Sequence, residues 1–317
     1  MSSLFGHTRI KTRHLLLIAQ LDRDRSVLRA ADAVGMSQPA ASKLLREIED
    51  VFGVPLFERH ARGVVPTAYG ETVLRHARSI LASLDRAQIE VEALRRGEHY
   101  SVSIGTVLSP GTELLPTALS LLAARHPTME VRISTDASRP LIAQLLGGRL
   151  DIVIGRIRDV GDAAALEFEA IADEPHSVFV RRGHPLAQRR RVRIQDLVDQ
   201  TWVMPPADSL LRERINAMFL QHGLALPARI VETTSVPVIN NLLRRCDMLV
   251  ALPEEVVRPY CDSGMLQVLP IDTRIRMDAF GLVTRRGHRL SPHADEALDA
   301  LRDAARDIYG RKPRVVR

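Results

Sequence analysis

The feature that most constrains the fold is the segment 26–49, SVLRAADAVGMSQPAASKLLREIE, which predicts two short amphipathic helices separated by a glycine turn. Ser26 can cap the first helix, and Gly35 follows it where a residue that tolerates a left-handed backbone is needed. Ser37 can cap the second helix, and Pro39 is allowed in its first turn because the early N–H groups of a helix have no intrahelical acceptor. This arrangement predicts a helix-turn-helix, whose second helix enters the major groove of DNA.

Both helices are expected to be apolar on one side only. For the first helix we expect an apolar stripe of Val27, Leu28, Ala30, Ala31 and Val34. For the second helix we expect the inward-facing residues to be Ala40, Ala41, Leu44, Leu45 and Ile48. Its polar outer face would then carry Gln38, Ser42, Lys43 and Arg46.

The flanking segments are suited to complete this module. Upstream, residues 15–21 supply a third helix that can cover the pair. Downstream, the turn at 53–55 leads to two short β-prone runs around Arg59 and Arg62. Such a hairpin has the shape of a wing, which can lie along the DNA backbone.

These segments resemble the amino-terminal signature of LysR-type transcriptional regulators. The resemblance runs without a gap through about residue 70 and rests on Ala30-Ala31, Ser37-Gln38-Pro39-Ala40-Ala41-Ser42, Ile48-Glu49, Leu56-Phe57-Glu58-Arg59 and Pro66-Thr67-Ala68-Tyr69-Gly70. One departure is Arg25, where that family usually has glycine before the capping serine. By resemblance, the DNA-contacting positions are Ser37, Gln38, Pro39, Ser42 and Lys43. The alternative for Ser37 is a capping role without DNA contact.

The side chains of this module fit the chemistry of DNA recognition. Gln38 can pair bidentately with adenine, whereas Lys43 or Arg46 suits guanine or phosphate. Arg59 and Arg62 in the wing are better placed for phosphate or the minor groove. The alternative for Arg46 is an ordinary exposed helix charge. A twofold dimer would read an inverted repeat whose halves lie one helical turn, or a multiple of it, apart.

A long helix is expected from Thr67 to about Arg96, ended by Gly97. Its apolar residues are spaced by four or three, as in the narrow seam of a coiled coil, at Tyr69, Val73, Ala77, Ile80, Leu84, Ala87, Val91 and Leu94. A dimer seam is the preferred interpretation because so long a helix without a breaker is unusual in a globular domain. The alternative is a helix packed within its own chain.

From Tyr100 the pattern changes to alternating strands and helices, which predicts parallel βαβ units in two subdomains. The first run contains strands at 102–105, 129–135 and 150–155 and helices at 116–126 and 140–146. The second contains strands at 166–172, 177–180, 201–204, 229–231 and 248–252 and helices at 194–198, 209–222, 236–245 and 253–260. The segments 266–270, 280–284 and 292–309 would most simply return to the first sheet.

Two such subdomains joined by two crossings form the architecture of periplasmic binding proteins, which the regulatory half of LysR-type regulators shares. LLPTALSLLAARHPTMEV, LLGGRLDIVIG, RRGHPLA and VALPE resemble its landmarks, whereas Cys246-Asp247 departs from the usual Gly-x-Gly. We therefore predict an α+β multidomain chain: a winged helix-turn-helix (1–66), a linker helix (67–97) and a two-lobed α/β effector domain (98–317). Lobe I would span about 98–162 and 268–310, and lobe II about 163–267.

A ligand in such a domain is expected between the lobes, outside the carboxyl ends of the strands. The loop after the first strand, with Thr106, Ser109 and Thr112, could hold a small anion at the start of the next helix. Arg156 could pair with a carboxylate. The second subdomain would contribute Met204, Pro205, Thr234 and Ser235. The alternative is that Thr112 and Ser235 are only helix caps and that Arg156 is a surface residue.

Composition adds mainly exclusions. The formal charge of +6 includes the blocks 189–193 and 311–317, which are more typical of solvated surface than of DNA contacts. No apolar run is long enough to span a membrane and no secretory signal is recognisable, so we expect a cytoplasmic protein. The two cysteines, Cys246 and Cys261, cannot form a disulfide framework; they are either a redox switch or ordinary thiols. No catalytic motif, metal-ligand spacing or cofactor motif is present, so an enzyme is not expected.

The sequence thus predicts a LysR-type regulator that senses a small, anionic metabolite. Its partners would be promoter DNA containing an inverted repeat and the small-molecule inducer, with RNA polymerase as a further candidate. The protein itself would be a homodimer or a homotetramer. Ligand would shift the population between two lobe closures and so alter promoter binding or bending. The alternative is a ligand-binding or transport protein of periplasmic-binding-protein fold that does not bind DNA.

Overall fold

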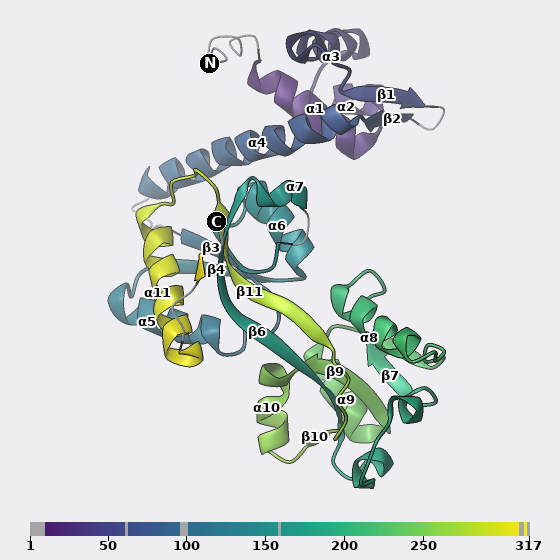
Figure 1. Cartoon of the computed structure of the whole chain (residues 1–317). Coiled ribbons are helices and arrows are strands. Elements are labelled where there is room, and N and C mark those ends of the chain that lie inside the picture. The colour runs from purple at the N-terminus through teal and green to yellow at the C-terminus, as the bar shows by residue number, and fades with distance from the viewer. Residues whose placement is uncertain (1–9, 61–62, 96–100, 158–159, 311–313, 316–317) are drawn as a thin grey trace. The chain divides into compact units, whose positions relative to one another are not determined.

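The computed structural model of the 317-residue chain describes residues 10–60, 63–95, 101–157, 160–310 and 314–315 (Figure 1). These residues divide into two compact units. The first contains the described residues up to 103 together with 142–151, and the second contains those of 104–141 and 152–317. Within the described residues, no helix combines the length and the apolar character needed to cross a bilayer.

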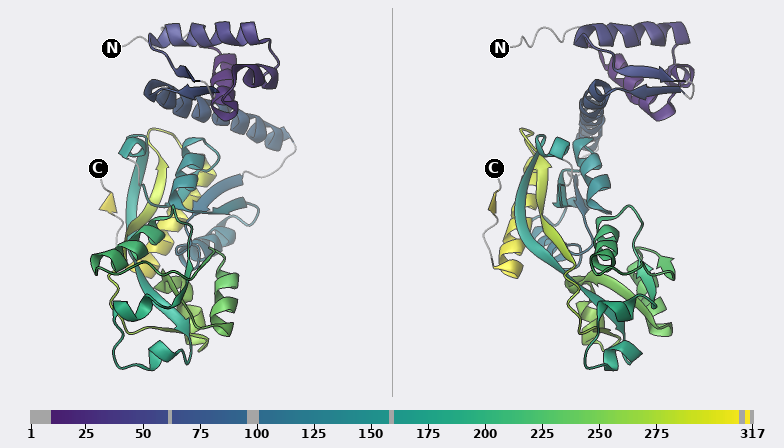
Figure 2. Two further views of the ribbon diagram at one scale, coloured as in Figure 1. Left: turned by 90° about the vertical axis from the view of Figure 1, so that its right-hand side faces the viewer. Right: turned by 45° about the vertical axis from the view of Figure 1, so that its right-hand side comes forward.

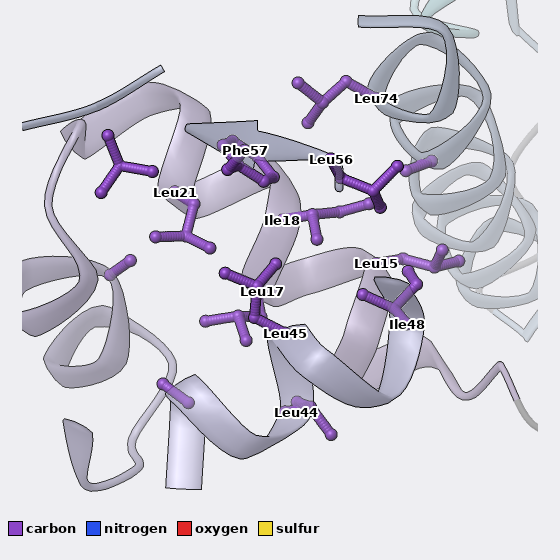
Figure 3. Packing of buried hydrophobic residues seen from close by; sticks show 14 of the residues in the cluster. Leu15, Leu17, Ile18, Leu21, Leu44, Leu45, Ile48, Leu56, Phe57 and Leu74 are labelled. Carbon is purple, nitrogen blue, oxygen red and sulfur yellow. The ribbon is translucent and has the colours of Figure 1, made fainter. Parts of the chain in front are cut away.

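The first unit begins with the predicted helix-turn-helix and wing. Its elements are α1 (Thr12–Asp24), α2 (Val27–Ala33), α3 (Gln38–Phe52) and the antiparallel pair β1 (Phe57–His60) and β2 (Gly63–Pro66). Figure 3 shows the buried side chains that converge between them, among them Leu17, Ile18, Leu21, Leu45 and Ile48. This shared core sets the orientation of α3, because Ala41, Leu44, Leu45 and Ile48 are its buried face.

Two residues expected in this core lie outside it. Leu28 is 59% exposed, and Ala40 is also exposed. The buried face of α3 is therefore narrower than predicted, because Ala41 and Leu44 already fill the interior on that side. Ala40 joins the outer face of α3.

The junction between α1 and α2 uses a left-handed residue, which explains the family's glycine at this position. Arg25 ends α1 with φ 54° and ψ 21°, and its N–H donates to the Leu21 carbonyl. The Arg25 carbonyl in turn accepts a hydrogen bond from the Val64 N–H of the wing, at 2.9 Å. Gly63 has φ +127°, and a Cβ there would overlap the same carbonyl oxygen. The wing and the helix junction therefore fit only with glycine at 63.

The predicted linker helix is α4 (Ala68–Arg95), and its expected end at residues 96–97 lies outside the described residues. The expected seam divides into two parts. Val73 and Ala77 pack, together with Leu74, against the core of the helix-turn-helix. Tyr69, Ile80, Leu84 and Val91 are instead 60%, 48%, 50% and 55% exposed. One end of the helix is thus fixed to its own domain, whereas apolar side chains farther along face outward.

After the linker helix, the described strands form one mixed sheet in the order β4-β3-β5-β11-β6-β9-β7-β8, with β10 and β12 also paired to β6. The strands are β3 (Ser101–Thr106), β4 (Glu130–Thr135), β5 (Ile152–Gly155), β6 (Leu166–Arg181), β7 (Thr201–Met204), β8 (Ile230–Glu232), β9 (Met248–Pro253), β10 (Leu266–Val268), β11 (Arg276–Arg285) and β12 (Arg314–Val315). The expected parallel pairing is confirmed for β3 with β5 and for β7 with both β8 and β9.

The helices of this region agree closely with the predicted ranges, except that α7 lies in a segment where no helix was expected. They are α5 (Leu114–Arg125), α6 (Ser138–Leu146), α7 (Val160–Ala163), α8 (Leu210–Gln221), α9 (Val236–Arg245), α10 (Glu254–Asp262) and α11 (Pro292–Tyr309). The expected helix at 194–198 is a 3₁₀ turn, Ile194–Leu197, and a second 3₁₀ turn spans Pro185–Gln188. As predicted, the last helix returns to the first part of the domain, because α11 packs against α5.

The two long antiparallel strands β6 and β11 differ from the expectation and lie side by side in both views of Figure 2. The predicted strands 166–172 and 177–180 are one continuous strand, β6. Its residues up to Pro175 pair with β11, and those from His176 onward pair with β9. The acidic, proline-containing stretch 173–175, which separates the two predicted strands, belongs to the ladder, with Pro175 opposite Arg276.

The expectation that residues 266–270 return to the first sheet was also wrong. Their strand, β10, pairs with Phe179–Arg181 in the second half of β6. The chain crosses back only with β11, which pairs with both β5 and β6.

Candidate functional site

The outer face of α3 carries the predicted DNA-contacting side chains. Gln38, Pro39, Lys43 and Arg46 are exposed, and Ser42 is half-buried. The amide of Gln38 donates a hydrogen bond to the Ser42 hydroxyl at 3.2 Å. One amide N–H and the carbonyl oxygen of Gln38 remain available, and these are the two groups that a bidentate contact to adenine needs.

Ser37 stands at the amino-terminal boundary of α3, and its carbonyl accepts the first helical hydrogen bond, from Ala41. Its hydroxyl makes no capping hydrogen bond, and the residue is exposed. A purely capping role for this side chain is therefore not what the structure shows.

The wing presents Arg59 on the exposed side of β1, whereas Arg62 lies outside the described residues. Glu49 fixes the start of the wing to α3. Its carboxylate accepts hydrogen bonds from the backbone N–H groups of Leu56 and Phe57, at 2.8 and 3.3 Å. These hydrogen bonds hold the start of the β1–β2 hairpin next to α3.

In the second unit, the predicted ligand loop follows β3 and is already engaged with a carboxylate of the same chain. The buried Ser109 hydroxyl donates to Glu255 Oε2 at 2.9 Å. The exposed Thr112 hydroxyl lies 2.7 Å from the Ser109 carbonyl and 3.3 Å from Glu255 Oε1. The Thr106 hydroxyl is buried and donates to the Val107 carbonyl.

Arg156 follows β5 and is buried rather than on the surface, with 6% of the residue exposed. Its guanidinium donates to Glu174 Oε2 at 2.9 Å and to the Asp278 carbonyl. Both partners come from the long strands: Glu174 from β6 and Asp278 from β11. Arg156 therefore joins the end of β5 to the two strands that cross between the halves of the domain.

The remaining predicted residues lie together at the carboxyl ends of β7 and β8. Met204 is buried and Pro205 half-buried, whereas Thr234 and Ser235 are exposed. Ser235 precedes α9, and its side chain makes no capping bond. This region shares a hydrophobic cluster with the ligand loop, because Leu108 packs against the cluster that contains Val203 and borders Val236.

Sequence reasoning missed Glu255, Tyr309 and Glu174. Tyr309, at the end of α11, places its hydroxyl 3.3 Å from both oxygens of Glu255. Nothing in the local sequence distinguishes Glu255 from Glu254, because both lie in the first turn of α10. The hydrogen bond between Ser109 and Glu255 joins residues 146 positions apart, and local sequence patterns carry no information about so distant a pair.

Burial dominates the electrostatics of this cluster. Desolvation raises the pKa of Glu255 above its ordinary value, and the Glu113 carboxylate raises it further, although the hydroxyls of Ser109, Tyr309 and Thr112 act in the opposite direction. Burial also raises the pKa of Tyr309, helped by the nearby Glu255 carboxylate. Beside Glu174, burial lowers the pKa of His176, which favours the neutral imidazole.

The described residues contain no group of three or more His, Cys, Asp or Glu that could hold a metal ion. Both cysteines are free thiols; Cys246 is exposed, and burial raises the pKa of Cys261. A raised pKa lowers the thiolate fraction and hence the reactivity of Cys261.

Two family models match the chain. Residues 12–71 match the bacterial regulatory helix-turn-helix protein, lysR family, and residues 95–306 match the LysR substrate binding domain. The chain is 37% identical over 302 residues to the HTH-type transcriptional regulator GbpR of Azospirillum brasilense, covering 95% of this chain and 88% of that protein. It is 34% identical over 304 residues to the HTH-type transcriptional regulator PcaQ of Agrobacterium fabrum, covering 95% and 97%.

A solved structure supports the fold. Full-length OxyR C199D from Pseudomonas aeruginosa is 22% identical and has a TM-score of 0.55, with 98% of this chain and 100% of that chain covered. The family models account for both halves of the chain, which favours a regulator over a transport protein without DNA binding. The chain belongs to the LysR family and is a DNA-binding transcriptional regulator with an effector-binding domain.

Proposed function

We propose that the protein reads its promoter through the outer face of α3 and the wing, and that a small anionic metabolite in the effector domain controls this binding. The observation that carries the first part is the exposed row of Gln38, Lys43 and Arg46 opposite the fully buried face of α3. Ser37, Pro39 and Ser42 complete this surface, and Arg59 and Arg62 contact phosphate or the minor groove from the wing.

The proposed effector site lies where the carboxyl ends of β3 and β5 face those of β7 and β8, because these two pairs of strands run in opposite directions along β6. Thr106, Ser109 and Thr112 line it from one side, and Met204, Pro205, Thr234 and Ser235 from the other. The support is that the loop after β3 already receives a carboxylate, so its hydroxyls suit an anion. In this proposal Arg156 does not bind the effector directly, because its guanidinium already donates to Glu174. It acts on the site indirectly, by holding the long strands β6 and β11.

The regulator acts as a homodimer or homotetramer in the cytoplasm and has no enzymatic activity. The exposed Ile80, Leu84 and Val91 on α4 support a seam between two copies, because their spacing continues the predicted coiled-coil pattern. Two recognition helices held by such a seam would read the two halves of an inverted repeat. RNA polymerase is a further candidate partner at the promoter.

A gel-shift titration with the gene's own upstream region tests the proposal. Affinity should fall linearly on a log–log plot against salt, and cognate DNA should bind at least about 10³-fold more tightly than random DNA. Gln38→Ala should weaken cognate binding by roughly tenfold, because a bidentate base contact is worth about 1–3 kcal/mol. It should leave random DNA unaffected.

The matched variant is Arg59→Ala, which removes a phosphate contact and should weaken binding to all sequences equally. Equal losses on cognate and random DNA from Gln38→Ala would contradict the assignment of base reading to this residue. A wild-type protein that does not distinguish the two DNAs would contradict the proposed function itself.

A further inference from the structure

The loop after β3 holds a carboxylate from another part of the chain. Glu255 reaches it from the first turn of α10, and its two oxygens are divided among three hydroxyls. Ser109 donates to Oε2 at 2.9 Å, Thr112 lies 3.3 Å from Oε1, and Tyr309 lies 3.3 Å from both.

This carboxylate has hydroxyl partners but no cationic partner among the described residues. The charged neighbour that acts on it most is Glu113, which repels it. Its neighbour Glu254 differs, because its Oε1 accepts a hydrogen bond from the Ser177 hydroxyl, at 2.5 Å, and not from the loop. Glu255 is thus a half-buried anion held by neutral donors, in a place built to receive one carboxylate.

We propose that Glu255 occupies the place of the effector's carboxylate in the effector-free protein, and that an anionic effector binds by displacing it. This inference rests on the proposed function, because it assumes that the loop is the effector site. Only one carboxylate can accept the Ser109 hydrogen bond, and two carboxylates side by side repel each other. Glu255 is therefore an internal competitor whose removal raises the affinity of the loop for anions.

The same displacement supplies a physical link between ligand and conformation. The Glu255 contact joins the β3 loop and the end of α11 to α10, and Leu108 in that loop packs on the cluster containing Val256 and Val257 of α10. A ligand that replaces Glu255 breaks the hydrogen bonds that join α10 to the loop and to α11, and leaves the packing of Leu108 as a remaining contact. The effector then makes different contacts in the state with the Glu255 hydrogen bonds and in the state without them, and a population shift requires such a difference.

The test uses the full-length protein and acetate, a carboxylate small enough to take the vacated place. Glu255→Ala should be stabilised by 100 mM sodium acetate relative to 100 mM sodium chloride, with a thermal midpoint about 3–5 °C higher. This is the size expected for a ligand at roughly ten times its dissociation constant. Fluorescence of Trp202, the single tryptophan of the chain, reports unfolding of the second unit.

The matched control is Glu254→Ala, which removes the adjacent carboxylate without vacating the loop. It and the wild type should gain less than about 1 °C from acetate. The double variant Glu255→Ala/Ser109→Ala should lose the gain, because the donor to the bound carboxylate is gone. If Glu255→Ala does not fold, Glu255→Gln keeps the size of the side chain and should show a smaller gain of the same kind.

The proposal would be overturned if neither Glu255→Ala nor Glu255→Gln were stabilised by acetate relative to chloride. It would also be overturned if the wild type and Glu254→Ala gained as much from acetate as Glu255→Ala. Both results are independent of promoter recognition, which the gel-shift titration measures without effector. Failure of the displacement model therefore leaves the proposed regulator intact, and failure of the gel shift does not alter the acetate result.

Discussion

Replacing Arg25 with glycine tests whether a non-glycine residue at this position lowers the stability of the first unit. Arg25 has φ 54° and ψ 21°, a left-handed conformation that costs a residue with a Cβ about 1–2 kcal/mol. Glycine removes this cost but loses about 0.5–1 kcal/mol more backbone entropy on folding. Arg25→Gly should therefore be more stable than Arg25→Ala by about 0.5–1 kcal/mol.

The comparison with alanine matters because both variants lose the same ion pair. The Arg25 guanidinium lies 3.1 Å from Asp22, but it is 44% exposed, and Asp22 keeps Arg78 as a second partner. Such an exposed pair contributes roughly 0.2–1 kcal/mol. The alanine and glycine variants then differ by the Cβ alone.

The assay is urea unfolding of the full chain followed by circular dichroism at 222 nm, which reports the helices of both units, so that the transition of the first unit is the part not shared with Trp202 fluorescence. Trp202 fluorescence serves as an internal control, because this residue belongs to the second unit and its transition should not move. If Arg25→Ala proved as stable as Arg25→Gly, or more so, the argument from the left-handed backbone would be wrong.

Three further predictions concern packing and charge. Gly70→Ala should destabilise the first unit by about 2–3 kcal/mol in the same urea assay, because its Cβ would overlap the carbonyl oxygen of the buried Leu56, and an unchanged transition would contradict this. Glu174→Gln should lower the free energy of unfolding of the second unit, followed by Trp202 fluorescence, by about 3–5 kcal/mol, because it leaves the buried Arg156 without a carboxylate. The double variant Glu174→Gln/Arg156→Met should regain most of this stability. Because burial lowers the pKa of folded His176 below the unfolded value of 6.5, the stability that its neutral form confers is complete above pH 6.5 and declines as the pH falls through the folded-state pKa. Urea titrations between pH 5 and 8 should show a shallower decline for His176→Asn, and identical profiles would count against this role.

Most of the fold could be predicted because its signals are local. Gly35, Ser37 and the apolar spacing of α3 are contained within a few turns of chain, and α9 and α11 begin and end at the predicted residues. The apolar pattern was less reliable at Leu28 and Ala40, because a small core fills before every apolar residue is buried.

The long strand β6 shows where local patterns mislead. Asp173, Glu174 and Pro175 are typical of a loop, yet Glu174 is buried in the ladder because Arg156 neutralises it and Pro175 is accommodated beside Arg276. The partner that makes Glu174 acceptable is 18 residues away on another strand. For the same reason the sequence shows the hydroxyls of the loop after β3, whereas it does not show their contact with Glu255.

The continuous pair of β6 and β11 has a mechanical consequence for signalling. Because β6 is hydrogen-bonded to β11 along its first part and to β9 beyond it, the halves of the effector domain cannot slide past each other without breaking that ladder. Twisting β6 and β11 about their common direction is easier than sliding them, because the twist of a strand pair can change while its hydrogen bonds persist. Arg156 hydrogen-bonds to both strands, through Glu174 and the Asp278 carbonyl, so a rotation of one half relative to the other is the motion that this pair of strands permits.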